Sequence, residues 1–379
     1  MELNMGGIKS KSRKYIVSRE NLKVGDIILM FSGGLGSKLI SKSTGSQYSH
    51  VMIWCDDYCV HAVPEGIYSI NIDRVLVSEH DYIKVIRYEG GSGLGKVVEY
   101  AKNKIGSLYS KVEAVKVKAY PELANKNVQF CSRLVAQAYH QAGIEIVDDP
   151  DFCSPGDIEK SGLLTEVGNI VDLASERQIK FAKSVDPRKI EQSSMYDFLN
   201  PTFDVFKKNG CNVNNLSNIF DGLTRMPKLD KEVTDLLDLS GYLSFVDQDR
   251  DINNYRYDFE VMKEKIMSKD EGCLSYLNDF WNSNRREYER RVVELQEIYE
   301  LKIKYAGVSF FERFFDLRYR LLQNVMDRIR VYQLCLEEYS DYLMIKESYL
   351  KASLLQCDDH VRHWREVQRN CGRLEGVLN

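Results

Sequence analysis

The chain has 379 residues, with 44% hydrophobic and 28% charged side chains, and its formal net charge is −4. This composition is typical of a soluble globular protein of two or three domains, and it excludes the strongly basic character of nucleic-acid-binding proteins. No apolar run approaches the roughly 20 residues that a transmembrane helix needs.

The nine cysteines form no CxxC motif and no regular framework. The N-terminus also lacks the apolar core of a secretory signal. We therefore expect free thiols in a reducing, cytoplasmic compartment. Delivery by a dedicated secretion system is an alternative, because such delivery does not require an apolar secretory signal.

A polar leader, residues 1–20, precedes a β-rich region. The glycine-rich loop that follows the first strand, residues 32–38, lacks the Walker spacing, so it predicts a loop beside a site and not a phosphate-binding loop. Apolar runs bounded by turn residues predict the strands. These strands are residues 24–31, 49–55, 58–63, 67–72 and 82–87.

Helical patterns follow the strands. Residues 97–105 predict a helix closed by Gly106, and a second helix starts at Cys131 and ends at Gly143. A turn-rich loop covers residues 148–157. We assign residues 21–185 to one domain with a small antiparallel sheet and helices.

Beyond residue 185 the character of the chain changes. Residues 186–228, with Pro187 and Pro201, predict a linker region, and residues 229–379 predict an all-α helical bundle or coiled-coil-like domain. An apolar stripe runs from Phe315 to Leu343. We interpret it as bundle core, with docking of a partner protein or of a membrane surface through these helices as the alternative. The overall class is α+β.

Cys131 lies in the first turn of its predicted helix. Free backbone N–H groups and the positive end of the helix dipole favour a thiolate there, which predicts an acidic, nucleophilic cysteine. The alternative is a buried cysteine that acts as a small hydrophobe. A nucleophilic role requires a base nearby.

Only six histidines can supply that base. His140 is nine residues further along the helix, about 900° of rotation, and so lies on the opposite face from Cys131. His80 lies in a polar turn. His360 and His363 share a predicted helix with a cysteine, but their spacing places the side chains at different angles around that helix. We therefore expect no metal site and no cofactor.

The remaining pair is His50 and His61. If Asp56-Asp57 form a two-residue hairpin turn, both histidines lie on the same sheet face as diagonal neighbours, about 7–8 Å apart at Cα. A four-residue turn would keep the face, and a three-residue turn would separate them. The pattern predicts Cys131 as nucleophile, His50 as general base and His61 as the residue that orients His50. The backbone N–H of Cys131 would help to bind an oxyanion.

The order histidine, histidine, cysteine resembles the circularly permuted, NlpC-like papain-fold cysteine hydrolases. This group includes the YiiX/YebB-like proteins and relatives of lecithin–retinol acyltransferase. The resemblance covers about residues 22–165, and we recognise nothing in residues 190–379. The matching segments are residues 25–27, 44–51, 60–67, 106–109 and 130–135.

The resemblance implies the same nucleophile and base, with His61 as the third polar residue. YiiX-like members often have glutamate at that position, and histidine is more similar to the acyltransferase branch. Tyr109 matches a tyrosine that lines the family's substrate pocket, where we also place Ser49 and Ser132. Ser110 replaces an acidic residue that often follows this tyrosine.

Three functional hypotheses follow. The first is a cysteine hydrolase or acyltransferase that works through a thioester and takes a lipid acyl or peptide amide substrate. The second is a catalytically silent, papain-like scaffold with a helical interaction domain. The third is a bacterial effector or toxin, in which the helical half directs delivery or target choice.

Overall fold

The computed structural model describes residues 13–31, 33, 46–107, 130–267, 273–339 and 347–375. The chain forms two compact units, residues 1–222 and 223–379. The first unit contains the sheets, and the second is helical. The α+β class expected from the sequence is confirmed.

The main sheet of the first unit is antiparallel and has six strands in the order β5-β4-β3-β2-β6-β7. Each strand predicted before residue 90 is present, with ends shifted by about three residues or fewer. A small second sheet pairs β1 with β8. The strands are β1 Tyr15–Val17, β2 Ile27–Met30, β3 His50–Trp54, β4 Cys59–Val63, β5 Gly66–Ile70, β6 Ile83–Tyr88, β7 Leu164–Glu166 and β8 Val171–Leu173.

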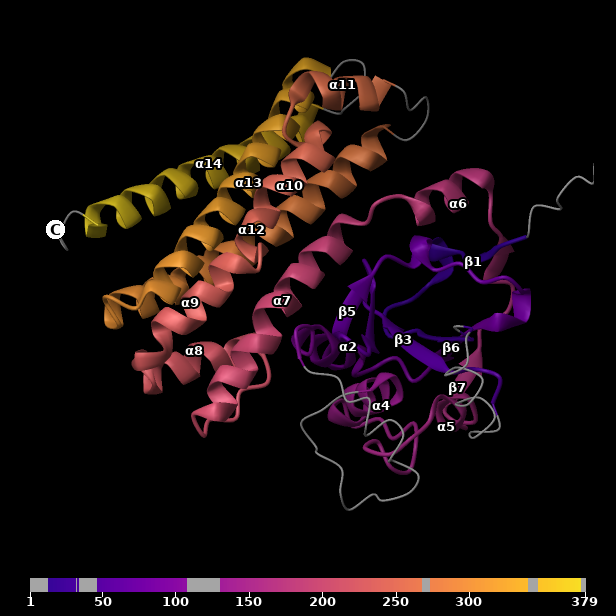
Figure 1. The fold of residues 1–379 in the computed structure, drawn as a ribbon. Coiled ribbons are helices and arrows are strands. Elements are labelled where there is room, and N and C mark those ends of the chain that lie inside the picture. The colour runs from indigo at the N-terminus through magenta and orange to yellow at the C-terminus, as the bar shows by residue number, and fades with distance from the viewer. Residues whose placement is uncertain are drawn as a thin grey trace, which may run out of the picture. The chain divides into compact units, whose positions relative to one another are not determined.

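Helices α2 (Leu94–Asn103) and α4 (Cys131–Gln141) cover one face of this sheet (Figure 1). Alternate side chains of the strands, such as Val51 and Ile53, form a buried core with them. The opposite face has its own core around Met52 and Trp54. The sheet therefore has apolar residues on both faces, and its strands read as nearly continuous apolar runs.

A buried ion pair joins the sheet's central strands. Asp26 precedes β2 and is 1% exposed, and Arg87 in β6 donates from Nε and a terminal nitrogen to its two carboxylate oxygens, each at 2.7 Å. Arg87 also donates to the Asn21 carbonyl. Such a two-pronged contact fixes the relative position of two strands.

The segment expected to be a linker, residues 186–228, contains helices α7 (Pro187–Lys208) and α8 (Leu216–Arg225). Pro187 occupies the first turn of α7 after the N-cap Asp186, a position where proline favours a helix. Before it, the short helices α5 (Pro155–Glu159) and α6 (Glu176–Lys183) each begin with a capping box. The two compact units divide after Gly222, within α8.

The second unit is organised around α13 (Ser309–Tyr339), which packs against the other long helices (Figure 1). Phe315, Leu322, Met326 and Ile329 of the predicted stripe are buried in this packing, as the bundle-core interpretation predicts. Leu343 lies outside the described residues. The other helices are α9 Asp230–Leu239, α10 Phe245–Ile252, α11 Phe259–Met267, α12 Cys273–Lys304 and α14 Glu347–Glu375.

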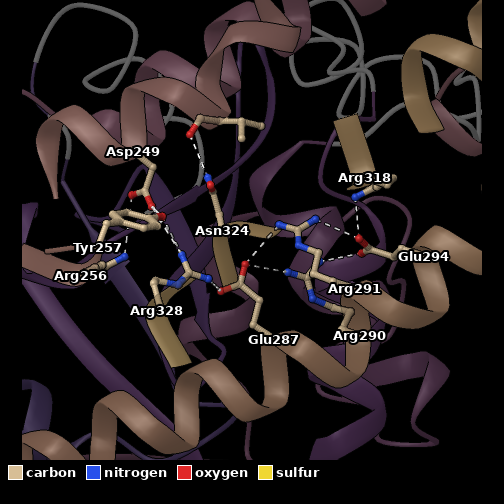
Figure 2. Close-up of polar contacts among 11 residues, drawn as sticks. Asp249, Arg256, Tyr257, Glu287, Arg290, Arg291, Glu294, Arg318, Asn324 and Arg328 are labelled. Carbon is tan, nitrogen blue, oxygen red and sulfur yellow. Dashed lines mark hydrogen bonds and ion pairs between the residues drawn. The ribbon is translucent and has the colours of Figure 1, made fainter. Parts of the chain in front are cut away.

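A network of charged side chains crosses the interior of this second unit (Figure 2). Arg328 of α13 is 6% exposed and donates to Glu287 of α12 at 2.7 Å and to Asp249 of α10 at 3.5 Å. Glu294 of α12 accepts from Arg318 of α13 at 2.6 Å. Although burial opposes ionisation, the surrounding arginines lower the pKa of both glutamates. The network thus ties three helices together through paired charges.

Candidate active site

The hairpin of β3 and β4 has the register that a two-residue turn predicts. Ile53 pairs with Val60, and the Cys55 N–H donates to the Tyr58 carbonyl at 2.8 Å. Asp56 in the turn has φ of 80°, the left-handed conformation that such turns require. The alternative three-residue turn is therefore wrong.

His50 and His61 meet on one face of this hairpin. His50 Nε2 lies 2.9 Å from His61 Nδ1, and the ring centroids are 5.2 Å apart with the planes at 76°. One of these nitrogens donates and the other accepts. If His50 uses Nε2–H as the donor, its Nδ1 has a free lone pair and can take a proton from a thiol. The predicted proximity of the two imidazoles is confirmed.

Both imidazoles are poor proton binders in this environment. Burial lowers the pKa of His50 to about 4. Burial, and then the neighbouring His50, lowers the pKa of His61 to about 3. Both rings are therefore neutral near pH 7, so His50 is in the protonation state that a general base needs.

Cys131 is the first residue of α4. Phe130 before it is extended, with φ of −136°, and its carbonyl accepts the helix bond from the Leu134 N–H at 2.9 Å. The sulfur lies where the backbones of Val51, Ser132 and Cys131 itself offer hydrogen bonds. Because Val51 directly follows His50 in β3, the start of α4 is placed beside the strand that holds the candidate base.

The thiol of Cys131 is not acidic in this structure. Burial raises its pKa to about 11 and outweighs the hydrogen bonds from the backbone. The expectation of a low pKa at the helix N-terminus is thus wrong for the resting structure, because desolvation penalises the thiolate more than the first helical turn stabilises it. Attack by this neutral thiol therefore needs transfer of its proton to a base during the reaction.

The predicted pocket residues have different surroundings. Ser132 is 2% exposed, and its hydroxyl donates to the Cys153 carbonyl at 2.7 Å, which ties α4 to the segment before α5. Ser49 is buried directly before His50, and its N–H donates to the Met30 carbonyl. Tyr109 lies outside the described residues. The substrate-pocket role of all three stays a prediction.

The other histidines have separate partners. His140 contacts Glu145 at 2.8 Å, and His80 contacts Asp81 at 3.0 Å. In the second unit His363 contacts the Tyr288 hydroxyl at 2.8 Å. Across the described part of the chain, no group of three histidine, cysteine or acidic side chains is arranged to hold a metal ion.

The sequence patterns do not predict one neighbour of His61. In the register of β4 with β5, Tyr68 lies directly opposite His61. Tyr68 stacks on Tyr196 of α7, with ring centroids 4.8 Å apart and planes at 24°. The alternation in β5 could have placed Tyr68 on this face, but no local signal connects it to a residue so distant in sequence.

Part of the chain resembles known proteins. Residues 21–159 match the model of the permuted papain-like amidase family YaeF/YiiX, C92. That match confirms the resemblance to permuted papain-like cysteine hydrolases over this part of the chain. No curated protein matches the chain.

Five chains among solved structures also match. One is the crystal structure described as the metalloprotein yiiX from Escherichia coli O157:H7. It is 22% identical, the match covers 38% of this chain and 96% of that chain, and the TM-score is 0.31.

Among the helices of the described residues, none has the length and apolar character that a membrane span requires.

Proposed function

We propose that residues 21–185 form a cysteine hydrolase or acyltransferase domain that works through a thioester on Cys131. The observation that supports this most is the 2.9 Å contact between His50 of β3 and His61 of β4, together with the hydrogen bond that the Val51 backbone, next to His50, offers the Cys131 sulfur. The match of residues 21–159 to the amidase family supports the same chemistry.

In the first step the Cys131 sulfur attacks the carbonyl carbon of an amide, ester or thioester, while His50 Nδ1 takes the thiol proton. The tetrahedral oxyanion accepts a hydrogen bond from the Cys131 backbone N–H. His50 then passes its proton to the leaving nitrogen, oxygen or sulfur, and an acyl thioester remains.

In the second step a water or an acceptor hydroxyl or amine attacks the thioester. His50 again takes the proton and returns it to the departing Cys131 sulfur. His61 orients His50 by accepting from Nε2–H and stays neutral throughout. A neutral partner stabilises the His50 imidazolium less than a carboxylate would, so we expect a smaller catalytic contribution from His61 than from His50.

The nature of the third residue favours lipid acyl substrates over peptide amides, through the resemblance to the acyltransferase branch. Turnover of p-nitrophenyl acyl esters of increasing chain length, compared with peptide p-nitroanilides, tests this. Longer acyl esters should react faster than the anilides. Addition of hydroxylamine distinguishes transfer from hydrolysis by the product formed. Preference for the anilides would contradict the lipid assignment.

The silent-scaffold alternative rests on the raised pKa of the Cys131 thiol. It predicts that no ester or amide acylates the parent protein, and that Cys131→Ala changes no measurable property of the papain-like domain. The effector hypothesis makes a further prediction. Expression in a eukaryotic host should slow growth with the parent chain and not with Cys131→Ala.

A further inference from the structure

Strand β5 is the terminal strand of the six-stranded sheet. The backbone groups of successive residues point in opposite directions along this strand. Those of Tyr68 point toward β4, whereas those of Ile67 and Ser69 point away from β4, to the edge of the sheet. Such edge groups need hydrogen-bond partners when they are covered.

Two side chains of α7 supply partners for these groups, and the backbones of Gly106 and Ser107 also bond to Ile67, each at 3.3 Å. The buried Gln192 accepts from the Ser69 N–H at 2.6 Å and donates to the Ser69 carbonyl at 2.9 Å. The buried Tyr196 accepts from the Ile67 N–H at 2.6 Å and donates to the Ile67 carbonyl at 2.8 Å. One turn of α7 thus holds the two residues of β5 that flank Tyr68.

The contact between α7 and β5 is very close. An added Cβ at Gly66 would lie 2.0 Å from the Tyr196 ring, so only glycine fits at the start of the strand. Tyr68 itself stacks on Tyr196 and hydrogen-bonds the Ser193 side chain, one residue beyond Gln192. Tyr68 is therefore fixed between α7 and the neighbouring strand.

Tyr68 is also the cross-strand neighbour of His61. Directly opposed residues have Cβ atoms about 4.5–5.5 Å apart and pack against each other. The strand register therefore connects α7 through β5 to His61, and a 2.9 Å contact connects His61 Nδ1 to His50 Nε2.

We propose that Gln192 and Tyr196 are positioning residues, which hold β5 so that Tyr68 keeps the His61 ring in hydrogen-bonding contact with His50. This inference deepens the proposed function and rests on it. It assigns α7, which follows the segment that matches the amidase family, to the working unit of the site.

The test uses the full-length chain with Tyr196→Phe, which keeps the ring stack and removes the hydroxyl that holds Ile67. Nitrogen-15 NMR of histidine-labelled protein reports the hydrogen bond at His61 Nδ1. In the variant this resonance should shift toward the value of a free imidazole nitrogen. Acylation of Cys131 by p-nitrophenyl acetate should slow about tenfold, because small displacements of catalytic groups are costly.

Tyr139→Phe is the matched control. It also removes a buried tyrosine hydroxyl, which donates at 2.5 Å to the Gly25 carbonyl just before β2, a strand separated from β5 by β3 and β4. It should lower thermal stability without moving the His61 resonance. Gln192→Met is a second variant, which removes the side chain that binds Ser69. It should have the same effect as Tyr196→Phe, and it replaces that variant in the test if Tyr196→Phe folds poorly.

A double-mutant comparison separates positioning from general weakening. In a His61→Ala background, Tyr196→Phe should change the acylation rate by less than roughly twofold, because the residue it positions is gone. A full additional loss in that background would overturn the inference, and so would an unmoved His61 resonance in Tyr196→Phe. If the parent is never acylated, the proposed function fails while the NMR result still decides the positioning claim.

Discussion

His50 Nε2 lies 2.9 Å from His61 Nδ1, with the two rings 76° apart, on a hairpin whose turn is Asp56-Asp57. This contact leaves His50 Nδ1 for the proton of a thiol. It also makes the third residue of the proposed triad a neutral imidazole, which has consequences for pH dependence.

The activity should persist to unusually low pH. His50 acts as a base only when it is neutral, and burial lowers its pKa to about 4, so kcat/KM should stay level through pH 5 and fall as the pH drops through about 4. The alkaline change should lie near 11, the pKa of the Cys131 thiol. A pH–rate profile with an activated ester measures both limits, and circular dichroism at each pH confirms that the chain is folded. An acidic limit between 6 and 7 would contradict this environment for His50.

The same burial should make the fold sensitive to acid. The pKa of His61 is about 3 in the folded chain against about 6.5 unfolded, so the unfolded state binds more protons below pH 6.5. The free energy of unfolding should therefore fall between pH 7 and pH 5, by about 2 kcal/mol from this residue. Urea unfolding of parent and His61→Asn at both pH values measures it. The variant should lose less stability on acidification than the parent does, and an equal loss would contradict the lowered pKa of His61.

The hairpin shows how much of the site could be predicted from sequence. The alternation of residues 49–55 and the Asp56-Asp57 turn fix the register by local rules, so the diagonal placement of His50 and His61 on one face follows from counting. The helix start at Cys131 follows from the apolar spacing after it. The thiol pKa could not be predicted in this way, because it depends on burial by elements distant in sequence.

Helix α7 shows what local rules miss. The prolines Pro187 and Pro201 favour a linker by local rules, yet Pro187 occupies the first turn of a helix, where its missing N–H costs nothing. The partners of Gln192 and Tyr196 are 123 and 129 residues away, and no pattern near residue 190 points to them. The docking of this helix on β5 therefore depends on tertiary contacts.

The buried pair of Asp26 and Arg87 should be essential to the first unit. Asp26→Asn leaves the guanidinium buried without a carboxylate, which costs about 3 kcal/mol in comparable pairs. Urea unfolding should show this loss, while Asp81→Asn, at an exposed carboxylate, should unfold like the parent. Equal stability of Asp26→Asn and parent would show that the pair does not join β2 to β6 as described.

The helical unit has a corresponding weak point at Arg328. Arg328→Met removes the charge that Glu287 and Asp249 share and leaves Glu287 among fewer cations, so we expect a loss of about 3 kcal/mol in unfolding free energy. Lys231→Met, in an exposed pair with Asp235, is the control and should change nothing measurable. If the two variants unfold alike, the network of Figure 2 does not stabilise the bundle.

Trapping of the acyl-enzyme tests the assignment of Cys131 and His50 most directly. The chain is mixed briefly with a p-nitrophenyl ester, quenched in acid and mapped by peptide mass spectrometry. We predict one acyl group on Cys131, removable by hydroxylamine as a thioester is, absent in Cys131→Ala, slowed at least about a hundredfold in His50→Ala and less in His61→Ala. Acylation spread over the other cysteines, or acylation of Cys131 at the same rate without His50, would contradict a nucleophile activated by this histidine.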